Sequence, residues 1–192
     1  FLIMLGLGQL VAGSLSDTLG RRPVLLSGSL LFAIAGAAAL VAPTIELMIL
    51  ARAVQGFGAS ACMAVGRVII NDSFDRTEAG RQLSTITMIQ SIVPLMGFAG
   101  GGLIADFIGW RGSIGIMVLT AAVIFTANLA LLGETNQNRV PRAPLLKVMG
   151  VFLLLVRSRE FMVHASSGAL LTAAYFALGG FMPYQFQRLG AS

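Results

Sequence analysis

The sequence has 192 residues, of which 56% are hydrophobic and only 11% are charged. Soluble domains carry about a quarter charged residues, so this composition excludes a compact water-soluble globule and indicates a chain whose outer surface faces lipid. The formal net charge is +5, but the basic residues are scattered between apolar runs, which argues against a nucleic-acid partner and favours a role in membrane topology.

The first residues and the single cysteine narrow the possibilities further. The chain opens at Phe1 inside an apolar run, without an initiator methionine or a charged leader, and we interpret it as a fragment of a longer protein. Cys62 is the one cysteine, which excludes an internal disulfide and a cysteine-based metal cage. We expect no metal site and no cofactor.

Apolar stretches recur along the chain with short polar interruptions, which predicts an all-α polytopic membrane protein. In chain order the predicted helical segments are 1–12, which is too short to span, then 24–41, 47–70, 83–108, 112–132 and 161–186, the last bent or ended near Pro183. Between them we expect a turn at Pro43, a solvated loop over 71–82, a polar linker over 134–144, and an apolar segment over 145–156 that lies in the membrane interface.

The basic residues between these segments are strongly biased to one side of the membrane. Alternate crossing leaves Arg111 and Arg188 on one side, and the positive-inside rule assigns the opposite, richer side to the cytoplasm. The residues predicted on that cytoplasmic side are Arg21, Arg22, Arg67, Arg76, Arg81, Arg139, Arg142, Lys147, Arg157 and Arg159.

One polar pattern occurs twice. The spacing G-x3-D-x2-G-x-R is found over residues 13–22 and again over 102–111. Three predicted spans separate the copies, so they fall on opposite membrane faces. Repeats of inverted topology are a common way to build transporters with two alternately opening gates; chance similarity over four positions is the alternative.

The first copy lies in a longer signature. Residues 13–25 resemble the loop motif of the major facilitator superfamily, G-x-L-x-D-x-x-G-R-[RK]-x-x-L, and the matching residues are Gly13, Leu15, Asp17, Gly20, Arg21, Arg22 and Leu25. The chemistry suits a gate, because the glycines allow a sharp turn and Asp17 can pair with a neighbouring arginine in one state and release it in the other. The alternative is that Arg21 and Arg22 only set topology.

This resemblance implies a major facilitator fold, of which the chain would contain transmembrane helices two to seven. Residues 1–133 would form the N-terminal bundle of helices two to six, 134–160 a cytoplasmic linker with an interfacial helix, and 161–192 the start of the C-terminal bundle with helix seven.

A charged residue inside a predicted span is the second candidate site. Burying Arg52 in a bilayer costs roughly 2.5–3.5 kcal/mol, so we expect it to face a cavity or a partner rather than to snorkel at the surface. Residues 48–59 resemble the family's fourth-helix pattern L-x-x-x-R-x-x-Q-G-x-G-A, with Arg52, Gln55 and Gly56 in place and Met48 replacing the leucine. The resemblance implies that Arg52 helps couple proton movement to transport.

The proton carrier itself is a different residue. No carboxylate lies deep inside a predicted span. Either the proton-carrying carboxylate lies outside these residues, or Arg52 binds substrate directly.

A proline followed by glycines marks the segment 83–108. Pro94, Gly97, Gly101 and Gly102 resemble the fifth-helix antiporter motif G-P-x-x-G-G, although Phe98 stands where that motif has proline. Small residues allow helices to approach closely and Pro94 frees a backbone carbonyl. The departure at Phe98 weakens the case for export, and a general glycine packing face is the alternative.

Two further stretches point to one branch of the family. Residues 109–111 and 181–192 resemble bicyclomycin/chloramphenicol-resistance-type (Bcr/CflA-like) transporters. This resemblance implies a multi-pass inner-membrane antiporter that exports small hydrophobic or cationic compounds in exchange for protons by alternating access.

Other functions remain open at this point. Proton-coupled uptake of a small metabolite is the nearest alternative. An intramembrane enzyme would need a constellation such as H-E-x-x-H, and a channel would need a polar ring along a pore, and the sequence offers neither.

Overall fold

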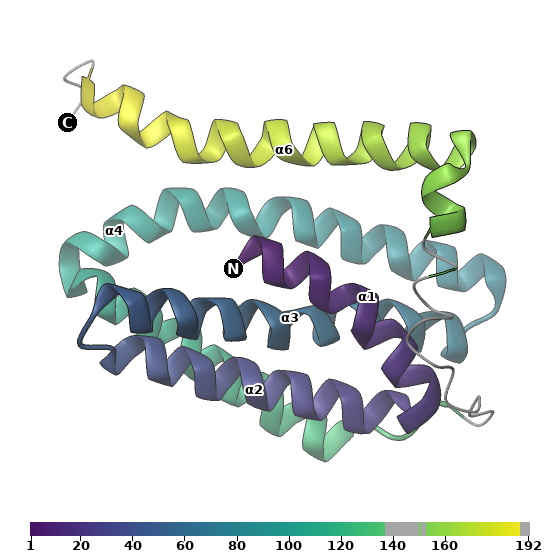
Figure 1. The fold of residues 1–192 in the computed structure, drawn as a ribbon. Coiled ribbons are helices and arrows are strands. Elements are labelled where there is room, and N and C mark those ends of the chain that lie inside the picture. Colours follow the sequence, from purple (N-terminus) through teal and green to yellow (C-terminus); the bar gives the residue numbers. More distant parts are fainter. Residues whose placement is uncertain (137–149, 151–152, 189–192) are drawn as a thin grey trace. The chain divides into compact units, whose positions relative to one another are not determined.

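The computed structural model describes residues 1–136, 150 and 153–188, and every regular element in these residues is a helix. The helices are α1 (Leu2–Leu19), α2 (Arg21–Val41), α3 (Ile45–Ser73), α4 (Arg76–Leu131) and α6 (Arg159–Arg188) (Figure 1). The chain divides into two compact units, which are Phe1–Pro141 with α1 to α4 and Arg142–Ser192 with α6. The predicted all-helical class is confirmed.

Five stretches of the described residues are long and apolar enough to cross a bilayer. They are Leu2–Leu19, Arg21–Val41, Ile45–Ser73, Asp106–Leu131 and Arg159–Gly179. The predicted span 83–108 is helical as the first part of α4, but it is not one of these five. The predicted interfacial segment 145–156 lies mostly outside the described residues.

The first helix corrects a prediction. The segment 1–12 was expected to be too short to span, but α1 continues to Leu19 and reaches 18 residues. The added turns contain hydroxyls that satisfy themselves within the helix: Ser16 Oγ donates to the carbonyl of Gly13 at 2.8 Å and Thr18 Oγ1 to that of Leu15 at 3.0 Å. A polar residue of this kind need not end a membrane helix.

The solvated loop predicted over 71–82 is wrong as well. Only Phe74 and Asp75 separate α3 from α4. The side chain of Asp75 accepts a hydrogen bond from the Glu78 amide at 2.9 Å and so caps the start of α4. The charged run therefore forms the ends of two helices.

Helix α6 continues past Pro183. Its backbone stays helical to Arg188, so an end near Pro183 is wrong, and a bend there stays a prediction.

Single glycines separate two pairs of helices. Gly20, with φ 108° and ψ 158°, joins α1 to α2, and Gly109, with φ 71° and ψ 170°, breaks α4 close to the predicted interruption after residue 108. Both have a positive φ that favours glycine, and both occupy the same position of the repeated pattern. Successive helices run in opposite directions, and the turn between α1 and α2 lies at the opposite end of the bundle from the bend in α4 (Figure 1). The shared geometry favours the inverted-repeat interpretation.

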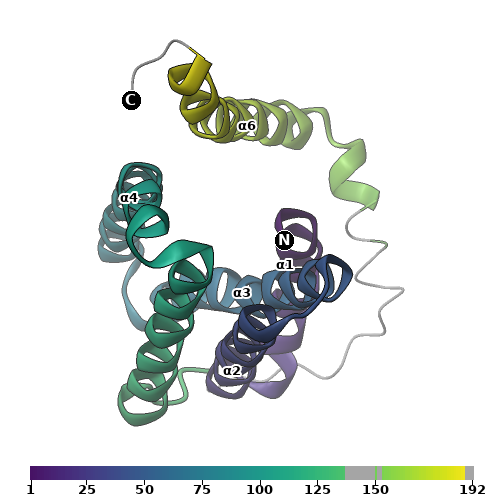
Figure 2. The ribbon, with the colours of Figure 1, turned by 90° about the vertical axis from the view of Figure 1, so that its left-hand side faces the viewer.

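Helix α3 packs against both α1 and α2 (Figure 2). The contact between α2 and α3 depends on small residues: a Cβ on Gly28 would lie 2.4 Å from the Cβ of Ala61, and one on Gly58 would lie 2.7 Å from the Gly28 carbonyl oxygen. Close backbone approach at small residues is how helices associate in lipid, where the hydrophobic effect gives no preference for helix contact. Residues Ala12, Val24, Leu25, Ala61 and Val65 form the buried cluster beside this contact.

This packing gives a prediction for stability. Gly28→Ala is expected to lower the free energy of unfolding by about 1–3 kcal/mol, because the new methyl group overlaps Ala61 in a helix pair that cannot separate freely. The matched control is Gly66→Ala in α3, where a Cβ would meet nothing within 4 Å and should stabilise the helix by about 0.5–1 kcal/mol. Thermal unfolding midpoints in detergent would measure both, and equal midpoints would contradict the close α2–α3 contact.

Candidate functional site

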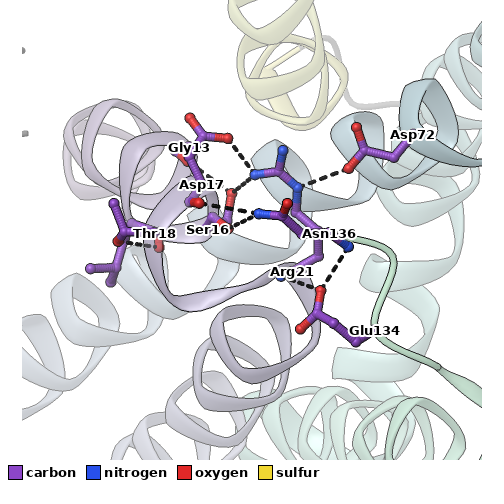
Figure 3. A network of polar contacts seen from close by, with 9 residues as sticks. Gly13, Ser16, Asp17, Thr18, Arg21, Asp72, Glu134 and Asn136 are labelled. Carbon is purple, nitrogen blue, oxygen red and sulfur yellow. Dashed lines mark hydrogen bonds and ion pairs between the residues drawn. The ribbon is translucent and has the colours of Figure 1, made fainter. Parts of the chain in front are cut away.

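The signature segment, residues 13–25, contains the end of α1, the turn at Gly20 and the start of α2. The guanidinium of Arg21 lies at the centre of the polar contacts around this turn (Figure 3). Arg21 Nη1 donates to Asp17 Oδ1 and, at 2.8 Å, to Ser16 Oγ, while Nε donates to Asp72 Oδ2 at 2.9 Å. The Arg21 side chain is 9% exposed, that of Asp17 50% and that of Asp72 29%. A largely buried arginine thus holds two partly exposed carboxylates on two different helices.

This arrangement can act as a latch. A guanidinium presents its donors in a rigid fork, which suits two carboxylates held on either side of it. Ion pairs that reach solvent contribute about 0–1 kcal/mol each, so they can break when the helices move. Asp72 brings α3 into the latch, yet it was not predicted as a site residue, because it belongs to the charged run that was interpreted as a loop.

The other signature residues have separate roles. Arg22 Nη2 donates to the carbonyl of Leu129 near the end of α4 at 3.0 Å, so it fastens α2 to α4 instead of joining the latch. Leu15 is partly buried against the apolar cluster. A Cβ on Gly13 would meet nothing within 4 Å, so no close contact in this unit requires a glycine there.

The second site lies around Arg52 in α3. Arg52 Nη1 donates to Gln55 Oε1 at 2.9 Å and to the sulfur of Met117 in α4 at 3.6 Å, and Gln55 Nε2 also approaches that sulfur at 4.0 Å. Gln55 is fully buried, and there is room for it because α2 has Gly36 opposite, where a Cβ would lie 2.7 Å from Gln55 Nε2. Sequence reasoning paired Arg52 with Gln55 and missed Met117, which lies 65 residues further along the chain.

The charge of Arg52 is only weakly compensated. Its guanidinium carbon lies 5.6 Å from the centre of the Phe1 ring, and no carboxylate pairs with it in the part of the chain that the structure describes. Gly56 allows α1 to come this close, because a Cβ there would lie 2.4 Å from the Phe1 carbonyl oxygen. The site therefore presents a cation held by neutral groups.

The residues that resemble the fifth-helix antiporter motif belong to α4, and within the described residues they contact neither the latch nor the Arg52 site. Pro94 lies inside α4, and a Cβ on Gly97 or Gly101 would meet nothing within 4 Å. The surroundings of Phe98 and Gly102 lie outside the described side chains. The antiporter role of this segment stays a prediction. No group of three or more acidic, histidine or cysteine side chains in the described residues could hold a metal ion.

Several known transporters and drug resistance proteins are similar in sequence to this chain. The sequence is 30% identical over 162 residues to multidrug resistance protein MdtM of Salmonella typhimurium, covering 84% of this chain and 39% of that protein. It is 29% identical over 180 residues to an uncharacterized transporter of Rickettsia bellii (94% and 44%) and 33% identical over 145 residues to a chloramphenicol resistance protein of Pseudomonas aeruginosa (73% and 34%). The chain thus spans less than half the length of these relatives.

A family match covers the whole chain. Residues 1–192 match the Major Facilitator Superfamily. With its repeated membrane-spanning helices, the chain belongs to the major facilitator superfamily.

Proposed function

We propose that this chain is part of a proton-coupled transporter of the bacterial inner membrane that exports small drug-like compounds by alternating access. The observation that carries the proposal is the weakly compensated charge of Arg52. It lies about 10 Å along α3 from Ile45, inside a candidate membrane span. An intramembrane arginine is expensive to retain and marks an ion or substrate pathway by default.

Arg52 has two ways to serve transport. Its charge would lower the pKa of a carboxylate brought close to it and so release a proton when the two approach. It could equally hold an anionic or hydrogen-bonding group of the substrate directly. In both cases Gln55 and Met117 orient the guanidinium, because they accept hydrogen bonds from Arg52 Nη1. Without these acceptors the guanidinium would be free to turn away.

The latch at the α1–α2 turn supports the alternating-access part of the proposal. Arg21 ties α1, α2 and α3 together at one end of the bundle, and its ion pairs are weak enough to break and form again. The topology prediction places this end at the cytoplasm, so the latch would stabilise the state closed to that side.

Export is favoured over uptake by the relatives. MdtM and the chloramphenicol resistance protein carry names that refer to drug resistance, and the resemblance of residues 181–192 points the same way. Phe98, which departs from the antiporter motif, favours the second candidate, proton-coupled uptake of a small metabolite.

A vesicle assay distinguishes the two directions. The full-length protein is placed in inverted membrane vesicles with an acidified lumen, and chloramphenicol or ethidium is added outside. An exporter is expected to release protons from the lumen on addition of substrate, seen as dequenching of a pH-sensitive dye, and vesicles without the protein should show no response. Accumulation of the compound in intact cells that express the protein would overturn the export proposal.

A further inference from the structure

The α1–α2 hinge, residues 16–22, leaves backbone groups that its own residues cannot satisfy. The last carbonyls of a helix and the first amides of the next have no partner within their helices. A helix start is usually capped by a Ser, Thr, Asp or Asn side chain, but the residue in that position of α2 is Gly20, which has none. Within the hinge, the Gly20 amide donates to the Ser16 carbonyl at 3.1 Å, which leaves the start of α2 to be capped from elsewhere in the chain or by water.

Glu134 supplies the cap for α2. Its Oε1 accepts a hydrogen bond from the Arg21 amide at 2.9 Å, across 113 residues of sequence (Figure 3). A carboxylate at this place is favoured twice, by the amide it satisfies and by the positive end of the helix dipole. The same oxygen accepts from the Asn136 amide at 2.9 Å, which holds the two residues in a tight turn.

Asn136 supplies the cap for α1. Its side-chain Nδ2 donates to the carbonyls of Ser16 at 3.3 Å and Asp17 at 3.1 Å, in the last turn of that helix. Glu134 and Asn136 thus satisfy both sides of the turn. Asp17 and Arg21, whose side chains form the latch, are the two residues whose backbones they hold.

We propose that residues 132–136 form a clasp on the hinge, in which Glu134 and Asn136 are positioning residues for the Arg21–Asp17 ion pair. The clasp follows α4 directly and precedes the segment that leads to the second unit. When the clasp is docked, the ends of α1 and α2 are fixed and the Arg21 side chain is aligned with Asp17. When the clasp is undocked, the Arg21 amide loses its hydrogen bond to Glu134 and the backbone of Arg21 is no longer held in place. This role rests on the proposed transport function, whereas the docking itself does not.

Hydrogen exchange tests the docking independently of transport. In the full-length protein, Glu134→Ala is expected to speed exchange of the Arg21 amide by about tenfold, because this amide loses its acceptor. The peptide over residues 16–22 reports that exchange. The matched control is Thr135→Ala in the same turn. Thr135 Oγ1 is buried and has no hydrogen-bond partner among the described residues, so its loss should leave this exchange unchanged. Equal exchange in the two variants would overturn the clasp.

A double-mutant cycle tests the positioning role. Glu134→Ala is expected to slow turnover several-fold while substrate binding stays at the wild-type level, and Glu134→Gln, which keeps an oxygen acceptor, should recover part of the rate. In an Asp17→Asn background the additional loss should nearly disappear, because both changes act on one ion pair. Independent, multiplying effects would overturn the positioning role. If the wild-type protein transports neither protons nor drug, the proposed function fails, and the exchange result alone decides the clasp.

Discussion

Arg52→Ala is expected to abolish proton-coupled transport while the protein still inserts into the membrane in normal amounts. The change removes the charge that is proposed to couple proton movement to substrate movement. Without this charge the two movements are no longer linked, so proton-driven transport should fall to the background level. The measurement is substrate-induced proton release in inverted vesicles, normalised to the amount of inserted protein.

The same helix offers a matched control for this variant. Arg67 is also in α3, but it is exposed and donates to Gln90 at 3.2 Å, as expected of an arginine that sets topology. Arg67→Ala should therefore retain coupling. Arg52→Lys, which keeps the charge but loses the fork toward Gln55 and Met117, should have an intermediate rate. Transport by Arg52→Ala at the rate of Arg67→Ala would contradict the role proposed for Arg52.

Asp17→Asn is expected to slow turnover about fivefold while substrate affinity changes little. The neutral amide keeps the shape of the side chain but loses a charge-assisted bond to Arg21. An ion pair that reaches solvent on one side, as this one does at Asp17, is worth about 1 kcal/mol. That energy belongs to one conformation of the gate. Separate measurements of equilibrium substrate binding and of the transport rate resolve the two effects.

Asp75→Asn is the control for the loss of a carboxylate at this end of the bundle. Asp75 caps α4 and takes no part in the latch, and asparagine caps a helix as well as aspartate does. This variant should turn over at the wild-type rate. If Asp17→Asn weakened binding and turnover to the same degree, its role would be general stability and the gating role would be wrong.

Helix α3 gives a physical reason to consider the two sites together. Arg52 and Asp72 are separated by about 30 Å along one continuous helix. Tilting α3 as a whole would displace Arg52 and strain the Asp72–Arg21 pair in the same step. The clasp, residues 132–136, connects the end of α4 to the same turn that holds the latch.

Local sequence predicted the helices well and some of their ends poorly. Long apolar runs gave the spans, because a membrane helix must be apolar over its whole width, and glycines marked the turns at Gly20 and Gly109, where a positive φ is needed. The errors at the end of α1 and at 71–82 have one cause. Hydropathy registers Ser16, Thr18 and Asp75 as polar, but their hydrogen bonds to nearby backbone groups let the helix continue or begin there.

By itself, the sequence determined that the chain is a bundle of membrane helices, that Asp17 and Arg21 share a turn, and that Arg52 and Gln55 share a helix face, because each of these relations spans only a few residues. The tertiary structure alone decided which distant groups complete the sites. Asp72, Glu134 and Met117 lie 51, 113 and 65 residues from the arginines they contact. How the helices pack determines which of these distant residues come into contact. Neither composition nor periodicity carries information about contacts over such separations in sequence.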